Sequence, residues 1–230
     1  MKTIGLVGGM SWESSIEYYR IINEEVRNRL GKLHSAQSLM YSVDFALVEM
    51  LQRNGRWKEA TQCMIDAAQR LEKGGADFVV ICTNTMHKMA DEVQASLHIP
   101  VLHVVDAAAD AVKQRGLRSV GLLGTRFTME EEFYKGRLEK KHGLTVLVPD
   151  APGRELVHRV IYDELVVGEL KQESKKAFLR IINGLIAQGT QGIVLGCTEI
   201  GLLIKDEDCT VPLFDTTRLH ALAAVAEALS

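Results

Sequence analysis

Short apolar runs alternate along the chain with longer stretches in which apolar residues recur at three- and four-residue steps. Uninterrupted valine, isoleucine and leucine are typical of strands in a parallel sheet that helices cover on both faces. The runs predict strands at residues 3–7, 38–43, 78–82, 100–102, 119–123, 145–148, 192–196 and 212–214. The stretches between them predict helices at residues 13–30, 56–73, 157–167 and 174–188. This alternation predicts an α/β fold with doubly wound parallel sheets.

The predicted helix at 56–73 illustrates the periodicity. Its apolar stripe is formed by Ala60, Met64, Ala68 and Leu71, which fall on one face of a helix. Gly74-Gly75 follows directly, and glycine commonly ends a helix because it adopts backbone conformations that other residues avoid.

One motif occurs twice. Residues 75–85 consist of a glycine turn, a buried strand and then Cys82-Thr83-Asn84-Thr85. Residues 189–199 repeat this order and end in Gly196-Cys197-Thr198-Glu199. Residues 4–10 likewise return as residues 120–126. Residues 100–102, with Asp106 and a following alanine-rich helix, return as residues 212–214 with Asp215 and the alanine-rich residues 221–228. Three matched segments in the same order indicate two homologous halves rather than chance likeness of βα units.

The repeat predicts a first half at residues 1–115, a second at 116–210 and a C-terminal segment at 211–230 that crosses back to the first half. Thr83 occupies the position of Cys197 in the alignment of the two copies. If the pseudo-symmetric halves face each other, the side chains of Thr83 and Cys197 are expected to point into one cleft between them. That arrangement suits a proton carried across a single carbon atom.

Cys197 is the main candidate for chemistry. It follows a buried strand, and open α/β sheets bind ligands beyond the carboxyl ends of their strands. Backbone N–H groups at a helix N-terminus can ionise a thiol at such a place. Cys82 stands one residue before the equivalent position, and alternate strand residues point to opposite faces. Cys82 is therefore expected to be a core residue.

Composition excludes several classes of function. The net charge of −3 gives no basic surface for nucleic acid, and no apolar run is long enough to span a membrane. Four cysteines without a paired spacing, and scattered histidines, fit a reducing cytoplasm and no metal site. Gly5-Leu6-Val7-Gly8-Gly9 lacks the third glycine of a dinucleotide loop. It is interpreted as a strand-to-helix turn whose N–H groups help to hold a carboxylate.

The sequence resembles the aspartate/glutamate racemase family along essentially its whole length. The resemblance rests on five motifs: residues 8–13, Thr83-Asn84-Thr85-Met86-His87, residues 121–128, Gly196-Cys197-Thr198-Glu199-Ile200 and residues 214–217. It implies two pseudo-symmetric α/β halves, a homodimer, and amino-acid racemisation without PLP or any other cofactor. The family carries one catalytic cysteine in each half. Here Cys197 is present, and Thr83 replaces the other cysteine.

The resemblance also implies which residues bind the substrate. Asn84, Thr85, Thr198 and Glu199 flank the α-carbon and hold the ammonium and carboxylate groups, while Met10 contributes from the first loop. Gln52 faces the far end of the substrate, where some relatives have arginine, and Arg53 or Arg126 could compensate for the missing charge. Thr125 completes the implied set.

Two alternatives to a racemase of L-aspartate or L-glutamate remain open. Arylmalonate decarboxylases, which are related, need only one protonating cysteine. A binding protein that has lost turnover with its first cysteine is the other alternative. The products distinguish the three functions: a racemase inverts the amino acid, a decarboxylase releases carbon dioxide, and a binding protein does neither.

Overall fold

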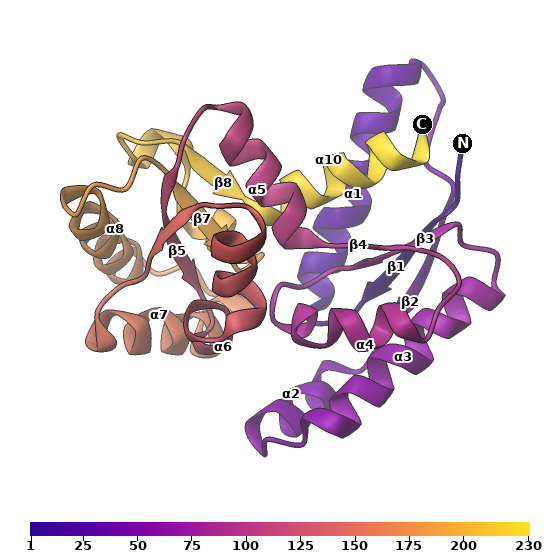
Figure 1. Ribbon diagram of the computed structural model, residues 1–230, viewed down its shortest axis with the longest axis horizontal. Helices are drawn as coiled ribbons and strands as arrows, with labels where there is room; N and C mark the ends of the chain where they lie inside the picture. Colours follow the sequence, from indigo (N-terminus) through magenta and orange to yellow (C-terminus); the bar gives the residue numbers. More distant parts are fainter. The chain divides into compact units, whose positions relative to one another are not determined.

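The computed structural model describes all 230 residues, which form two compact units (Figure 1). The first unit comprises Met1–His103 and His220–Ser230, and the second comprises Val104–Leu219. These bounds differ from the division at 115/116 and 210/211 that the repeat suggested. The difference arises because helix α5 (Val104–Gln114) packs with the second unit, and because helix α10 (Thr216–Ala228) joins the first unit from His220 onward.

Each unit contains one four-stranded parallel sheet, and the two sheets have equivalent strand orders, β2-β1-β3-β4 and β6-β5-β7-β8. All eight predicted strands are confirmed: β1 Ile4–Gly8, β2 Ser38–Ser42, β3 Phe78–Ile81, β4 Val101–Leu102, β5 Ser119–Gly124, β6 Thr145–Leu147, β7 Ile193–Gly196 and β8 Leu213–Asp215. The shared order supports the internal repeat, because each strand of the first half has its counterpart at the same place in the second sheet.

Helices cover both faces of each sheet. The remaining α-helices are α1 Trp12–Leu30, α2 Phe45–Arg53, α3 Trp57–Lys73, α4 Ala90–Ala95, α6 Arg126–Glu130, α7 Ala151–Asp163, α8 Gln172–Ala187 and α9 Ile200–Leu203. Four other helices complete the set: η1 Thr85–Met89, the π-helix η2 Glu132–Lys141, η3 Leu165–Val167 and η4 Asp206–Asp208.

The predicted helix at 157–167 was wrong at both ends. The helix begins earlier, because the Asp150 side chain caps it by accepting a hydrogen bond from the Gly153 N–H at 2.9 Å. It ends at Asp163, and the following residues form the separate turn η3.

Alternating residues of the first sheet face two cores. Leu6 and Val80 face α1 and the His220–Ser230 part of α10, whereas Val7 and Ile81 face α2, α3 and η1. Figure 1 shows α10 running beside α1. The second sheet is covered in the same manner, by α7 and α8 on one face and by α5 and η2 on the other. Burial on both faces explains why its strands are continuously apolar.

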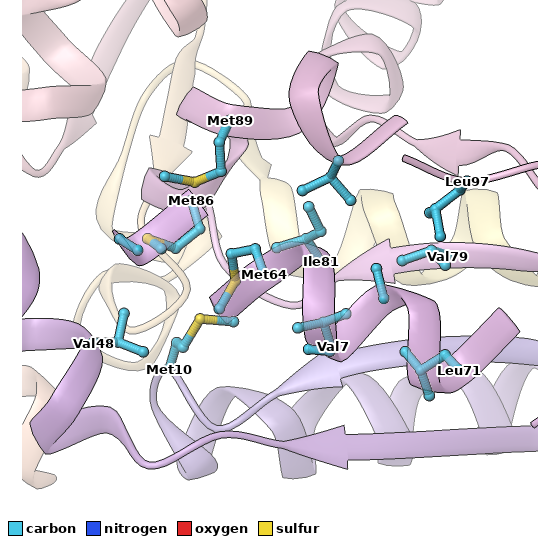
Figure 2. Packing of buried hydrophobic residues seen from close by; sticks show 14 of the residues in the cluster. Val7, Met10, Val48, Met64, Leu71, Val79, Ile81, Met86, Met89 and Leu97 are labelled. Atoms are coloured by element: carbon cyan, nitrogen blue, oxygen red, sulfur yellow. The ribbon is translucent and has the colours of Figure 1, made fainter. Parts of the chain in front are cut away.

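Methionines occupy one end of the core around α3 in the first unit. Figure 2 shows Met10, Met64, Met86 and Met89 together with Val48, at the opposite end of the cluster from Leu71, Val79 and Leu97. Met10 follows β1, and both Met86 and Met89 follow β3. The methionines therefore fill the core at the carboxyl ends of the strands, and their flexible side chains suit an irregular space.

The turn after β1 requires glycine. Gly9 has a φ of +92°, and a Cβ atom there would lie 2.2 Å from the Val43 carbonyl oxygen. The Gly9 N–H donates to Ser15 Oγ at 2.8 Å, and the Ser11 side chain caps α1 by accepting from the Ser14 N–H. These bonds fix the course of the loop that carries Met10.

A carboxylate joins α5 to the π-helix η2. Asp106 accepts hydrogen bonds from Arg137 Nε at 2.8 Å and Nη2 at 2.7 Å, from Lys141 Nζ at 2.8 Å and from His142 Nε2 at 2.7 Å. Burial alone would raise the pKa of Asp106, but these hydrogen bonds outweigh it and hold the pKa far below its usual range. The interaction stabilises the charged carboxylate and the placement of η2.

Replacing Asp106 should destabilise the fold in a pH-dependent way. We expect Asp106→Asn to lower the free energy of unfolding at neutral pH by about 1–3 kcal/mol, as for hydrogen bonds to charged groups. Because the folded pKa lies below the unfolded value, this stabilisation is present above about pH 4 and declines as the pH falls further. Urea unfolding at several pH values measures it. Asp110→Asn, an exposed change on the same helix, is the control and should have little effect.

Candidate active site

Cys197 directly follows β7, and its thiol contacts a carboxylate. Its Sγ atom donates to Glu199 Oε2 at 3.0 Å, and the Thr198 hydroxyl donates to the same oxygen at 2.6 Å. Cys197 is 8% exposed and Glu199 is 3% exposed. The Ile200 N–H donates to the Cys197 carbonyl at 3.2 Å, which turns the chain tightly from β7 into α9. A buried thiol and a buried carboxylate are thus held in direct contact.

The Cys197 thiol is protonated at rest. Burial raises its pKa well above the ordinary value, and the Glu199 charge and hydrogen bond raise it further. The backbone N–H groups of Glu199 and Thr198 lower this pKa, as the sequence suggested, but by less than burial and Glu199 raise it. Removal of the Glu199 charge, or transfer of the thiol proton to Glu199, would therefore favour the thiolate, although burial would still oppose it.

Glycines let the ends of β5 and β7 come close together beside Cys197. Gly124 pairs with Gly196, and a Cβ atom on Gly124 would lie 2.8 Å from the Gly196 carbonyl oxygen. Thr125 follows this pair and caps α6, accepting the Thr128 N–H at 3.3 Å. The expected ligand Thr125 is thus at the same sheet edge as Cys197.

Tyr134 is a neighbour of Cys197 that the sequence did not suggest. Its side chain lies fully buried on η2. Burial raises the pKa of its hydroxyl, the negative charge of an ionised Cys197 thiolate would raise it further, and the Thr216 hydroxyl lowers it. The Thr216 hydroxyl itself donates to the Leu195 carbonyl at 2.7 Å. No sequence signal marks Tyr134, because its position depends on the uncommon turn of a π-helix.

The equivalent edge of the first sheet carries Thr83, Asn84 and Thr85, which are 9%, 2% and 5% exposed. The Thr83 N–H donates to the Ile81 carbonyl at 2.8 Å, and the His87 N–H donates to the Asn84 carbonyl at 3.1 Å. The His87 ring also donates, from Nδ1 to the Thr83 carbonyl at 2.7 Å. The sequence alone indicates no role for His87, although its spacing of about one helical turn from Thr83 is consistent with this contact.

Met10 and Gln52 lie at this first edge too. Gln52 is 6% exposed, and its Nε2 donates to Met86 Sδ at 2.9 Å. Met10 belongs to the same buried cluster as Met86. The first unit therefore groups Met10, Gln52 and the Thr83 turn, whereas the second groups Thr125 with Cys197, Thr198 and Glu199.

The two arginines considered as partners for an acidic substrate bind other groups. Arg53 pairs with Glu49 at 2.7 Å on the same helix, and its side chain is 76% exposed. Arg126 lies 3.6 Å from Glu155 with half of its side chain exposed. Cys82 is a core residue, as predicted: it is fully buried among residues of α1 and α10, and burial raises its pKa strongly.

No group of three or more histidine, cysteine, aspartate or glutamate side chains is arranged to hold a metal ion. None of the helices has the length and apolar character needed to cross a bilayer.

Comparison with known proteins identifies the family. The model of the Asp/Glu/Hydantoin racemase family matches residues 7–224. The chain belongs to this family. Its fold matches a structure from Yersinia pestis described as a candidate Asp/Glu racemase, with 53% identity, a TM-score of 0.94 and full coverage of both chains. An aspartate racemase homologue from Pyrococcus horikoshii matches with 35% identity, a TM-score of 0.86 and full coverage of both chains.

A broad-specificity amino-acid racemase of Bacillus subtilis is 25% identical over 179 residues, which cover 75% of this chain and 74% of that protein. The resemblance inferred from the motifs and the expectation of an enzyme of the Asp/Glu racemase type are confirmed.

The contact between Cys197 and Glu199 predicts how the thiol titrates. In Glu199→Gln the negative charge is lost, so the pKa of the Cys197 thiol should fall. The ultraviolet absorbance of the thiolate, followed against pH and corrected by subtracting Cys197→Ser, measures this. An unchanged or higher pKa in Glu199→Gln would contradict the electrostatic role of Glu199.

Proposed function

We propose that this member of the family is a PLP-independent racemase of aspartate or glutamate, in which Cys197 removes the α-proton of the L enantiomer. The observation that carries the proposal is the buried Cys197–Glu199 contact of 3.0 Å at the carboxyl end of β7. Membership of a racemase family supports it. A thiol beside a carboxylate is a nucleophile or base with its own proton acceptor.

The first step transfers the thiol proton to Glu199. The Sγ–H bond breaks, a bond forms between that proton and Oε2, and a thiolate and a neutral carboxylic acid result. Because the acid carries no charge, it no longer opposes the thiolate. The thiolate then takes the α-proton of the substrate, and the electron pair of the Cα–H bond remains on the substrate as a carbanion.

The carbanion is protonated from the Thr83 side to give the D enantiomer. After the transfer the Thr83 alkoxide takes a proton from water, and the protonated Glu199 releases its proton to water, which returns both groups to their starting states while Cys197 keeps the α-proton as its thiol proton. The proposal requires the Cys197 and Thr83 centres to act on opposite faces of one α-carbon. N–H and hydroxyl groups of Asn84, Thr85 and Thr198 stabilise the charge on the substrate carboxylate.

Gln52 is proposed to contact the side-chain end of the substrate. Its amide is oriented by the bond to Met86 Sδ, and an amide can donate to a carboxylate or accept from an amide. Met10 adds apolar contact from the first loop, and Thr125 adds a hydroxyl from the second unit. A homodimer, which the resemblance implies, and a cytoplasmic location, which the sparse unpaired cysteines fit, belong to the same hypothesis.

The replacement of one cysteine by Thr83 favours a second candidate, a decarboxylase that uses the single thiol to protonate a carbanion. A non-catalytic amino-acid binding protein is the third. The three differ in their products: inverted amino acid, carbon dioxide, or unchanged ligand.

Incubation with single enantiomers in D₂O should distinguish these functions. We expect L-aspartate or L-glutamate to gain α-deuterium and to give the D enantiomer, without added PLP and in the presence of EDTA. NMR follows the exchange, and chiral chromatography follows the inversion. Carbon dioxide release, a requirement for PLP, or binding without exchange would reject the racemase.

Two cysteine variants test the choice of base. Cys197→Ser should lose exchange on the L enantiomer by at least about 10²-fold, the usual contribution of a positioned base. Cys82→Ser is the matched control, since it should keep most activity and mainly reduce stability. A folded but inactive Cys82→Ser beside an active Cys197→Ser would reverse the assignment.

A further inference from the structure

A buried network of three histidines and a tyrosine lies behind the Thr83 turn in the first unit. His87, His103 and His220 are 2%, 8% and 0% exposed, and Tyr18 is 0% exposed. The ring of His87 lies 4.6 Å from that of His103 and 5.6 Å from that of His220, between centroids. None of the proposed steps uses these side chains.

Hydrogen bonds hold the network in one arrangement. His220 Nε2 donates to the Leu102 carbonyl at 2.9 Å, so Nδ1 of a neutral His220 accepts from the Tyr18 hydroxyl at 2.9 Å. These partners lie on three elements, α1, β4 and α10. The His220 ring is therefore fixed, and its edge contact restricts rotation of the His87 ring.

His87 in turn fixes the peptide unit of Thr83. The carbonyl of Thr83 can only accept, so the 2.7 Å bond requires a proton on His87 Nδ1. The N–H of Thr83 is also bound, to the Ile81 carbonyl. With both backbone groups of Thr83 engaged, its backbone dihedral angles are set. The direction of the Cα–Cβ bond of Thr83 follows from these angles, and the direction of the Asn84 N–H follows from the Thr83 carbonyl because the peptide is planar.

This matters more at Thr83 than at Cys197. The thiol has a carboxylate in contact that can take its proton, whereas a threonine hydroxyl is a poor acid and a poor base near neutral pH. Proton transfer through such a group depends on placement, and a displacement of about 1 Å can reduce a rate by roughly 10²-fold.

We propose that His87 is a positioning residue for the Thr83 centre: its Nδ1–H bond to the Thr83 carbonyl aims the Thr83 side chain, and the Tyr18–His220 pair with His103 holds the imidazole in place. The proposal rests on the proposed racemase function. It assigns His87 to the Thr83 side of the reaction alone.

The test separates the two sides of the reaction by measuring exchange and inversion together. Three variants are compared. In His87→Asn the amide nitrogen can take the place of Nδ1, in His87→Gln it lies nearer the place of Nε2, and His87→Leu has no donor. His98→Leu is the control, because the His98 side chain is 98% exposed and its charged neighbour is Glu72, which does not belong to the network.

We expect His87→Leu and His87→Gln to keep exchange on the L enantiomer, since Cys197 is untouched. Inversion, and exchange starting from the D enantiomer, should fall by about 10²-fold in both. His87→Asn should recover inversion to within about tenfold of the natural protein, and His98→Leu should change neither rate. A purely structural role of His87 would lower both rates together.

Parallel loss of exchange and inversion in folded His87→Leu overturns the proposal, as does full inversion in that variant or equal loss in the Asn and Gln variants. If His87→Leu does not fold, Tyr18→Phe decides. Selective loss of inversion supports the network, and unchanged inversion rejects it. Absence of exchange in the natural protein would instead reject the racemase function itself.

Discussion

Parallel pairing of the strands is the constraint on which the rest of the structure depends. Because all strands of a sheet run in one direction, the loops that follow them emerge at one edge. β1 and β3 deliver the Met10 loop and the Thr83 turn to the edge of the first sheet, while β5 and β7 deliver Thr125 and Cys197 to the edge of the second. Apolar side chains on both faces leave the strand ends as the place for polar chemistry.

The same topology supports two different chemical environments. At Cys197 burial and the carboxylate in contact with the thiol both raise the pKa of the thiol, and the carboxylate offers a proton acceptor. At Thr83 the side chain lies in a turn whose backbone is held by an imidazole. The second unit thus provides a thiol that can ionise. The first unit provides a hydroxyl whose contribution to proton transfer depends on its orientation. The duplication conserved the framework and let the functional groups diverge.

Much of this arrangement could be predicted from the sequence, because burial on both faces makes parallel strands continuously apolar and glycines mark where they turn. The strands, the helix at 56–73 with its stripe, the core role of Cys82 and the position of Cys197 followed from such local patterns. The raised pKa of the Cys197 thiol could not be predicted from such patterns, because it depends on the balance between burial, the Glu199 carboxylate and two backbone N–H groups. Tyr134 and His220 were missed because their neighbours are distant in sequence.

The assignment of α5 and α10 to the two units has a consequence for the history of the chain. α5 follows the last strand of the first half but packs in the second unit, and most of α10 follows the last strand of the second half but packs in the first. Equivalent helices have thus been exchanged. A half-length chain standing alone would lack one of the two elements that cover that face of its sheet, α10 beside α1 in the first unit or α5 beside η2 in the second. In the intact chain each unit receives this helix from the other half, so a single cut between the halves would separate both helices from the sheets that they cover.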